Sequence, residues 1–370
     1  MDRKSARGSS SRPDRHKKKR FSSNQFTAEK DCSYTSASAA KLKKFGDEEI
    51  VINKNFGYCL LEFFSVFQTL STLIVCATCK EEIKFSQTAP RGLGFKITLQ
   101  CSCENVRYIQ SCPLVNKAYE INRRIVTAMR LLGVGREGIN IFCSVMDICK
   151  GLCISTYYSC LDNLHTAASA IYDQLISKAV KEEQELLSEF EPNENPKHLT
   201  VSGDGTWKKR GFTSLFGVTT LIGKYSKKVI DTVVKSSFCQ GCCQGDLLHR
   251  CLGSETQNNN ESLNSLIWTF APKHIHAGSQ TIQIANYLAV AIFNEGYLPI
   301  LKMMELMGIT VGTEAHSFAI RRNEVRIERS ELRATAASKE GRTARLAERT
   351  SQNIEYEVEE GPMYGSGIAN

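Results

Sequence analysis

Two cysteine pairs offer the first chemistry in this sequence. Cys76 and Cys79 form a Cys-x₂-Cys pair, and Cys101 and Cys103 form a Cys-x-Cys pair after 21 intervening residues. Four thiolates in two such pairs are the ligand set of structural zinc, with Zn–S distances of about 2.3 Å. The second pair is tighter than Cys-x₂-Cys, so Cys112 is an alternative fourth ligand. We therefore expect a structural Zn²⁺ site of the zinc-ribbon kind, against the alternative of buried thiols without metal.

A second group combines cysteine and histidine in the stretch FCQGCC…HRC. Its ligands would be Cys239, Cys242 or Cys243, His249 and Cys251, which also suit tetrahedral zinc. The chain holds 15 cysteines and no apolar export segment in its first twenty residues, so we expect reduced thiols rather than disulfides. The cysteines that lie unpaired in helical sequence are expected in the core: Cys143, Cys149, Cys153 and Cys160.

An acid at the end of an apolar strand is the third chemical feature. Asp204 ends the stretch HLTVSGDG, and Trp207, Lys208, Lys209 and Arg210 follow at once. A carboxylate in this position could bind Mg²⁺ or Mn²⁺ for phosphoryl transfer. An aromatic ring beside basic groups suits a DNA backbone or an unstacked base. Asp-Gly is also a common hairpin turn, and Trp207 could simply cover the sheet edge, so both interpretations stay open.

Hydrophobic periodicity indicates which elements position these groups. Apolar residues recur at helical spacing after Asn116, and Gly133 ends that helix. The period then changes to that of strands rich in Val, Ile, Thr and Phe, separated by Gly and Lys turns. We expect helices over 116–132, part of 138–148, 156–190, 261–270 and 281–296, strands within 198–205, 214–224 and 227–238, and a charged helix-prone tail from 321.

The stretch 58–79, YCLLEFFSVFQTLSTLIVCATC, is apolar over nearly the length of a membrane span. Glu62 and Gln68 lie inside it, and a charge near the bilayer centre costs about 2.5–3.5 kcal/mol. The stretch also runs directly into the first cysteine pair. We therefore expect a buried core segment that leads into the metal module, and no membrane insertion.

Basic residues gather at the start of the chain. Residues 1–20 hold nine Lys and Arg against two Asp, while the formal net charge of the whole chain is only +8. A head so charged and without aliphatic spacing cannot bury a core, so we expect it to be disordered. Its run HKKKR includes Lys17, Lys18, Lys19 and Arg20 and suits a nuclear import signal or a phosphate-binding arm, with a solvated tail as the alternative. The segment INRRIVTAMR is also basic on one side, and DNA readout there is an alternative to packing.

Three stretches together resemble a known family, the Mutator-like transposases of animals: VSGDGTWKKRGFTSLFGV at 201–218, KVIDTVVKSSFCQGCC at 228–243 and TQNNNESLNSLIWTFAPK at 256–273. The resemblance implies a ribonuclease H-like fold in which carboxylates bind two Mg²⁺ or Mn²⁺ ions for DNA strand transfer. By position, the family's first catalytic aspartate falls on Asp204 and the glutamate of its Asn-rich motif on Glu261. On its own, Glu261 is also an ordinary first-turn residue of a helix. The resemblance implies DNA as the partner and a nuclear location, and it leaves a homo-oligomer open.

The sequence departs from the family before the Asn-rich motif, where relatives carry a fourth strand with a second catalytic aspartate. Here Asp204 and Glu261 are only 57 positions apart. The acids between them, none of which ends a fourth apolar strand, are Asp231, Asp246 and Glu255. Two-metal chemistry then lacks a shared ligand, so we expect a DNA-binding protein without strand-transfer activity. The alternatives are an active two-metal transposase or nuclease, and a zinc-stapled protein-interaction module that uses the helix of 156–190.

The expected fold class is α+β. The expected organisation is a disordered basic arm over 1–45, a zinc-ribbon-like module over 46–115, a helical region over 116–195, a truncated ribonuclease H-like domain with a mixed sheet and flanking helices over 196–312, and a charged helical or disordered tail over 313–370.

Overall fold

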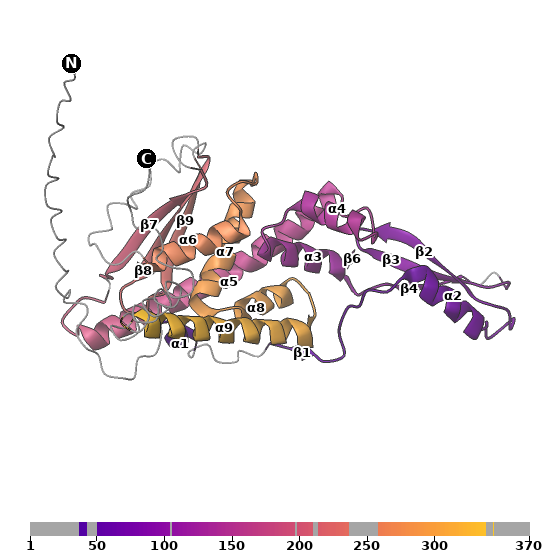
Figure 1. The fold of residues 1–370 in the computed structure, drawn as a ribbon, viewed down its shortest axis with the longest axis horizontal. Helices are drawn as coiled ribbons and strands as arrows, with labels where there is room; N and C mark the ends of the chain where they lie inside the picture. Colours follow the sequence, from indigo (N-terminus) through magenta and orange to yellow (C-terminus); the bar gives the residue numbers. More distant parts are fainter. Residues whose placement is uncertain are drawn as a thin grey trace, which may run out of the picture. The chain divides into compact units, whose positions relative to one another are not determined.

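The computed structural model describes residues 37–42, 50–103, 106–196, 198–209, 214–236, 258–337 and 343. All of them belong to one unit, Ser36–Asn370, in which helices are combined with several small sheets (Figure 1). The mixture of helices and strands agrees with the expected fold class. The basic head, with Lys17, Lys18, Lys19 and Arg20, lies outside the described residues.

The elements follow one another in this order. The helices are α1 (Ala37–Leu42), α2 (Phe63–Leu73), α3 (Glu120–Leu131), α4 (Arg136–Val145), α5 (Ile154–Phe190), α6 (Asn258–Phe270), α7 (Ser279–Glu295), α8 (Leu298–Leu306) and α9 (Thr313–Ala337). The strands are β1 (Ile52–Asn53), β2 (Lys84–Arg91), β3 (Gly94–Gln100), β4 (Val106–Gln110), β5 (Leu114–Val115), β6 (Ala118–Tyr119), β7 (Val201–Trp207), β8 (Phe216–Gly223), β9 (Val229–Ser236) and β10 (Val311–Gly312).

The first sheet has the antiparallel order β2-β3-β4, and α2 packs on one of its faces. Aromatic side chains make that contact, because the ring centroids of Phe63 and Phe95 lie 5.9 Å apart and those of Phe67 and Phe85 5.1 Å apart. Side chains alternate between the two faces of a strand, so the residues that pair in register with Phe85 share the face beneath α2. The opposite face of this sheet carries the alternate residues.

The prediction of a buried core over 58–79 is wrong for most of that stretch. Within α2 only Phe63 is buried, whereas Phe64 and Leu73 are 71% and 73% exposed, and Leu60, just before the helix, is 77% exposed. The helix carries no charged residue, and a sheet of three short strands can contact only one of its sides. Glu62 lies at the helix start, where its carboxylate accepts the amides of the first turn. Among the described helices, none combines the length and apolarity that a bilayer crossing requires.

The predicted helices after Asn116 are confirmed as α3, α4 and α5. Gly133 has φ of +73°, a conformation that ends α3 and that few other residues adopt. One apolar face of the long helix α5 is buried throughout: Leu161, Leu164, Ala168, Ile171 and Leu175. Among the unpaired cysteines, Cys143 and Cys160 are buried and Cys149 is partly buried, as predicted. Cys153 is exposed because it precedes the first turn of α5, so the core prediction is wrong for this residue.

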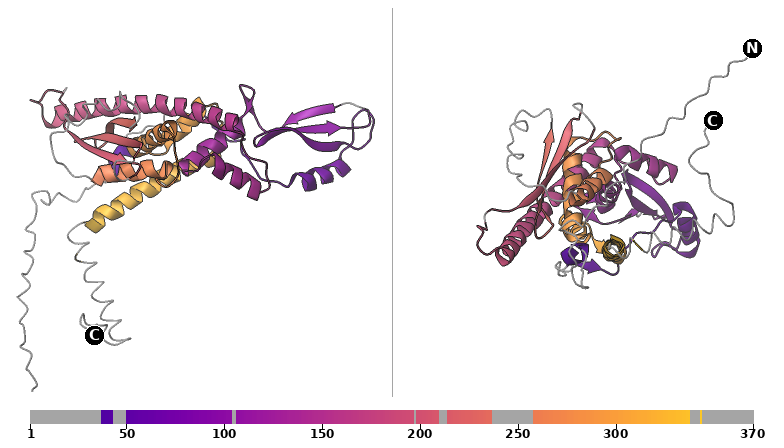
Figure 2. Two further views of the ribbon diagram at one scale, coloured as in Figure 1. Left: turned by 90° about the horizontal axis from the view of Figure 1, so that it is seen from above. Right: turned by 60° about the vertical axis from the view of Figure 1, so that its left-hand side comes forward.

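The second sheet has the antiparallel order β7-β8-β9 and carries Asp204 on β7. The three predicted strands are confirmed, as are the two helices that follow them, α6 and α7. Helix α6 contacts β7 and β8, while α7 and α5 both contact β9 (Figure 1, Figure 2). In register, Asp204 is opposite Thr220 of β8, and Thr220 is opposite Thr232 of β9.

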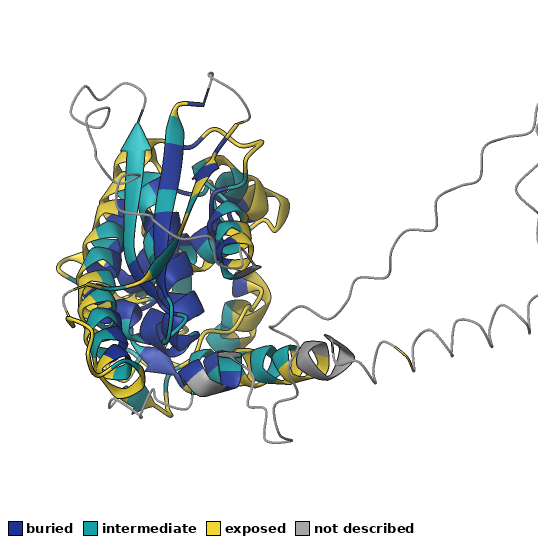
Figure 3. Cartoon of the chain, turned by 90° about the vertical axis from the view of Figure 1, so that its left-hand side faces the viewer, coloured by how far each residue is buried: buried dark blue, intermediate teal, exposed yellow. Residues whose placement is uncertain are grey.

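Both faces of the second sheet contribute to buried clusters. Val218 and Ile222 of β8 belong to the main core, together with residues of α5, α6 and α7. Leu221 and Ile230 point the other way and pack with Ala179 of α5. Figure 3 shows the buried residues gathered against the strands and between the helices. The sheet is therefore held from two sides, which fixes the face on which each polar side chain of β7 lies.

A buried lysine links the second sheet to two helices. Lys228, just before β9, is fully buried, and its Nζ donates to Glu182 Oε2 of α5 over 2.8 Å and to Glu295 Oε1 of α7 over 2.7 Å. Burial alone would lower the pKa of Lys228, but the two carboxylates outweigh it and raise the pKa above its ordinary value. The ammonium group is therefore charged at neutral pH and joins the three elements.

The β8–β9 turn is fixed by the next residue of α5. The buried carboxylate of Glu183 accepts the amides of Tyr225 and Ser226 over 2.9 and 2.8 Å. Gly223 makes room for it, because a Cβ there would lie 2.3 Å from Glu183 Oε2. Consecutive glutamates of one helix thus hold this hairpin in place.

Candidate functional site

Three side-chain hydrogen bonds join alternate residues of β7 to every fourth residue of α6. They run from Asn260 to Ser202, from Asn264 to Asp204 and from Trp268 to Thr206, over 3.1, 2.7 and 2.8 Å. Four residues of helix rise about 6.0 Å, and two residues of strand rise about 6.6 Å, so the two periods match closely over this length. The helix of the Asn-rich motif is therefore docked in register on the strand that carries Asp204.

The carboxylate of Asp204 is occupied within the protein. Its Oδ1 accepts the Gly205 amide over 2.8 Å, and its Oδ2 accepts the side-chain amide of Asn264 over 2.7 Å. Glu261 is exposed in the first turn of α6. The structure thus brings the helix that carries Glu261 to the strand that carries Asp204.

The acid on β9 cannot complete a site around Asp204. Thr232 shares the face of Asp204, since both are in register with Thr220, and the adjacent Asp231 therefore points to the opposite face of the sheet. The two other acids of the interval, Asp246 and Glu255, lie outside the described residues. Among the residues that the structure describes, Asp204 belongs to no group of three or more metal-ligand side chains.

Sequence reasoning missed the asparagines that contact β7. Asn260 is fully buried, and its Oδ1 accepts no hydrogen bond, nor does Oδ1 of Asn264 or Oγ1 of Thr220. The spacing Asn260, Asn264, Trp268 could have indicated the contact, because residues four apart share one helical face. The inner face of β7 is thus polar and built mainly from amides and hydroxyls.

The basic group after Asp204 is divided by the fold. Trp207 lies over Gly217, whose added Cβ would meet the indole at 2.6 Å, and the ring is 59% exposed. Lys209 is exposed, but Lys208 is buried, and burial lowers its pKa. Lys208 is therefore not placed for the predicted DNA contact, while Trp207 and Lys209 are accessible. Arg210 lies outside the described residues.

The arginines of INRRIVTAMR serve packing rather than DNA readout. Arg123 is buried and donates to the carbonyl of Met307, and Arg124 forms an ion pair of 2.7 Å with the buried Glu120. Arg130 is buried and donates to the carbonyl of Val134 over 3.1 Å. These contacts leave no basic face on α3 for a DNA groove.

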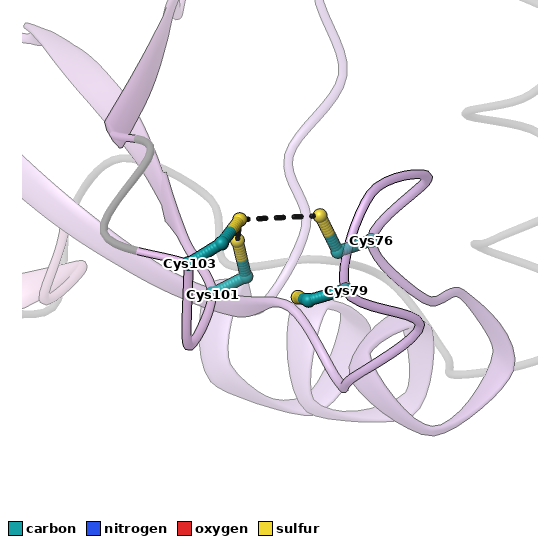
Figure 4. Close-up of side chains that lie close together, drawn as sticks. All are labelled: Cys76, Cys79, Cys101 and Cys103. Atoms are coloured by element: carbon teal, nitrogen blue, oxygen red, sulfur yellow. Dashed lines mark hydrogen bonds between the residues drawn. The ribbon is translucent and has the colours of Figure 1, made fainter.

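The cysteine pairs meet as predicted. Cys76 and Cys79 precede β2, Cys101 and Cys103 follow β3, and the four side chains point toward one another (Figure 4). All four sulfurs lie within 4.8 Å of one another, and Cys112 is not part of the group. Tetrahedral zinc would space its sulfurs about 3.8 Å apart. Cys76 Sγ and Cys103 Sγ are 3.7 Å apart, close to that spacing, whereas Cys101 Sγ and Cys103 Sγ are closer, at 2.8 Å.

The hydrogen bonds within this cluster shift the pKa values of its thiols in opposite directions. The amides of Cys79 and Thr78 donate to Cys76 and lower the pKa of that thiol to about 6. Hydrogen bonding to Cys103 raises the pKa of Cys101 to about 12. Crowded thiols retain protons that a divalent cation would displace, because a coordinating thiol is deprotonated. The second predicted group, Cys239, Cys242, His249 and Cys251, lies outside the described residues.

Comparison with known proteins gives the family. The family model of the Mutator-like transposase matches residues 57–258, more than half of the 370 residues, and the chain therefore belongs to this family. No curated protein and no solved structure matches the chain. The match contains the cysteine cluster and Asp204 and stops at the first residue of α6, so the role assigned to Glu261 depends on the Asn-rich motif alone.

Proposed function

We propose that this chain is a nuclear DNA-binding protein of the Mutator-like transposase family that lacks strand-transfer activity. The observation that carries the proposal is the state of Asp204, whose two carboxylate oxygens are engaged by Gly205 and Asn264. Two-metal catalysis needs a carboxylate that bridges the ions, together with further acids from other elements. The next acid after Asp204 along the chain, Asp231, is on the other face of the sheet.

The cysteine cluster supports a structural Zn²⁺ ion in the same protein. Its thiols join the turn before β2 to the turn after β3. A small sheet has little core to stabilise these strand ends, so a metal ion bound there would hold them together. Mg²⁺ or Mn²⁺ would belong to the ancestral site around Asp204. The basic head and the exposed Lys209 would supply contacts to DNA phosphates.

DNA binding through phosphates has a defined signature. The logarithm of the affinity for duplex DNA should fall linearly with the logarithm of the salt concentration, with a slope of about −0.9 for each phosphate neutralised. A gel-shift titration of the full chain over increasing salt measures this slope. Absence of binding at low salt would refute the proposed function, and deletion of residues 1–20 should reduce the slope if the head contributes.

An active two-metal enzyme is the second candidate, and the docking of α6 on β7 favours it. That contact brings the helix of Glu261 to the strand of Asp204. Cleavage of a linear terminal-repeat DNA with Mn²⁺, abolished by both Asp204→Ala and Glu261→Ala, would establish this candidate instead. The alternative of an interaction module built on α5 is weakened, because the apolar face of that helix is already buried in the core.

A further inference from the structure

The face of the first sheet opposite α2 meets the start of α3 at one end, where Tyr119 lies against Gly94 and donates to Gln110, and it carries exposed side chains farther along. The register places Ser86, Thr98 and Tyr108 side by side across β2, β3 and β4, on the face opposite Phe85 and Leu99. Because α2 packs against Phe85, it lies on the other side. Tyr108 is 60% exposed in this position. We name this surface, which also includes Lys84 and Lys96 by the same alternation, the open face.

The charge of this sheet is entirely positive. Its three strands, KFSQTAPR, GFKITLQ and VRYIQ, contain four basic residues and no acid. Lys84 and Lys96 lie on the open face, and Arg107 lies on the face of α2, in register with Leu99. The Lys96 ammonium is 5.4 Å from the centroid of the Tyr108 ring. A face of this kind, with cations, hydroxyls and amides around an exposed aromatic ring, is complementary to a polyanion that carries flat groups.

The occupant that fits is a single strand of DNA. In a duplex the bases are stacked on one another, whereas an unpaired base is free to stack on an exposed tyrosine. Lys84 and Lys96 are separated by four residue steps along the sheet, about 13 Å, which is enough for several nucleotides. The Lys96 ammonium, which now lies over the ring, would instead form an ion pair with a phosphate beside the stacked base.

We infer that the open face binds unpaired DNA, with a base on Tyr108 and phosphates on Lys84 and Lys96. The inference rests on the proposed DNA-binding function. It adds the surface of the first sheet that contacts DNA and the form of DNA that this surface binds. Ser86, which is exposed between the cations, offers its hydroxyl to the backbone, whereas Thr98 is buried beneath the surface and its hydroxyl is hydrogen-bonded to Thr88 over 2.5 Å. The four cysteines lie at one end of this sheet, so zinc would hold its strands in register.

The test uses the full, zinc-loaded chain and a fluorescently labelled oligonucleotide, in single-stranded and in duplex form. Fluorescence anisotropy is measured over a salt series. We expect Lys84→Gln with Lys96→Gln to reduce the slope of log affinity against log salt by about 1.4, since each contact to a single strand contributes about 0.7. Tyr108→Ala should weaken single-strand binding by about 5- to 150-fold, whereas Tyr108→Phe, which keeps the ring, should retain it.

Arg107→Gln is the matched control, because it removes the same charge from the same sheet on the opposite face. It should leave the affinity and the salt slope for the single strand unchanged. An equal effect of the control and of the lysine pair, or equal losses for duplex and single strand in the Tyr108→Ala variant, would overturn the inference. If the variant with both Lys84→Gln and Lys96→Gln keeps the original affinity and salt slope, the inference about the open face is wrong, while the proposed function stands. If the unaltered chain binds neither form of DNA, both the inference and the proposed function fail. Zinc content and the melting temperature, measured for each variant, confirm that the sheet is folded.

Discussion

Replacement of Asp204 by asparagine tests whether this carboxylate has a structural role or binds a metal ion. The carboxylate accepts two hydrogen bonds, over 2.8 Å from Gly205 and over 2.7 Å from Asn264. The two donors reach different oxygens, and asparagine replaces one of these oxygens by an amide nitrogen that cannot accept, so one of the bonds is lost. Hydrogen bonds to charged groups contribute about 1.5–3 kcal/mol and neutral ones about 0.5–1.5 kcal/mol. We therefore expect Asp204→Asn to lower the free energy of unfolding by about 1–3 kcal/mol.

Intrinsic fluorescence can report this change locally. The chain has two tryptophans, Trp207 on β7 and Trp268 on α6, so urea unfolding followed by their emission measures the contact between this strand and this helix. Asp231→Asn is the control, since this acid lies on the opposite face of the same sheet. A substitution away from such contacts should change the free energy of unfolding by less than about 0.5 kcal/mol.

Divalent cations supply the second half of the test. A site that binds Mg²⁺ in the folded state would gain about 2.7 kcal/mol of stability at a concentration 100 times the Kd. We expect Mg²⁺ and Mn²⁺ to leave the unfolding curve of this region unchanged, in the original chain and in Asp204→Asn alike. A large stabilisation of the original chain that disappears in Asp204→Asn would show that Asp204 is a working metal ligand and would refute the reasoning.

Three further predictions follow from other contacts. Lys228→Met leaves the buried Glu295 without its closest cation and should destabilise the fold by about 3–5 kcal/mol, whereas Lys228→Met combined with Glu295→Leu should recover most of the loss in the same urea assay. Glu183→Ala leaves two turn amides without an acceptor and should cost about 2–6 kcal/mol, which a thermal melt would detect. Purified protein should bind one Zn²⁺ at the first cysteine cluster; by elemental analysis Cys76→Ser should contain one Zn²⁺ fewer than the original chain, and Cys112→Ser the same amount. An unchanged zinc content in Cys76→Ser would contradict that ligand set.

Local sequence patterns predicted much of this fold. The helices α3 and α5 follow from apolar spacing, β8 from its Val, Ile and Thr content, and the first metal cluster from cysteine spacing alone. These features depend on residues that are close in sequence, and a period or a short spacing records them directly. The position of Gly133 at the end of α3 is of the same kind.

Features that depend on distant partners were not predictable in this way. Arg123 reads as a basic surface residue, but its guanidinium is buried against the carbonyl of Met307, 184 positions away. Asn264 reads as one more polar residue of an Asn-rich motif until β7 is placed beside it. The apolar stretch 58–79 reads as core, and only the small size of its sheet reveals that most of it stays exposed. In each case the sequence specifies the side chain but not its neighbour.

The consecutive glutamates of α5 have a consequence for how such a chain can change over time. Glu182 and Glu183 hold Lys228 and the β8–β9 turn, and neither partner is on the strand that carries Asp204. Mutations that erase catalysis therefore leave the anchoring of the hairpin intact. A gene of this kind can lose its enzymatic function while its product remains folded and is not degraded as a misfolded chain. A folded product is the condition under which a host can recruit the gene for another use.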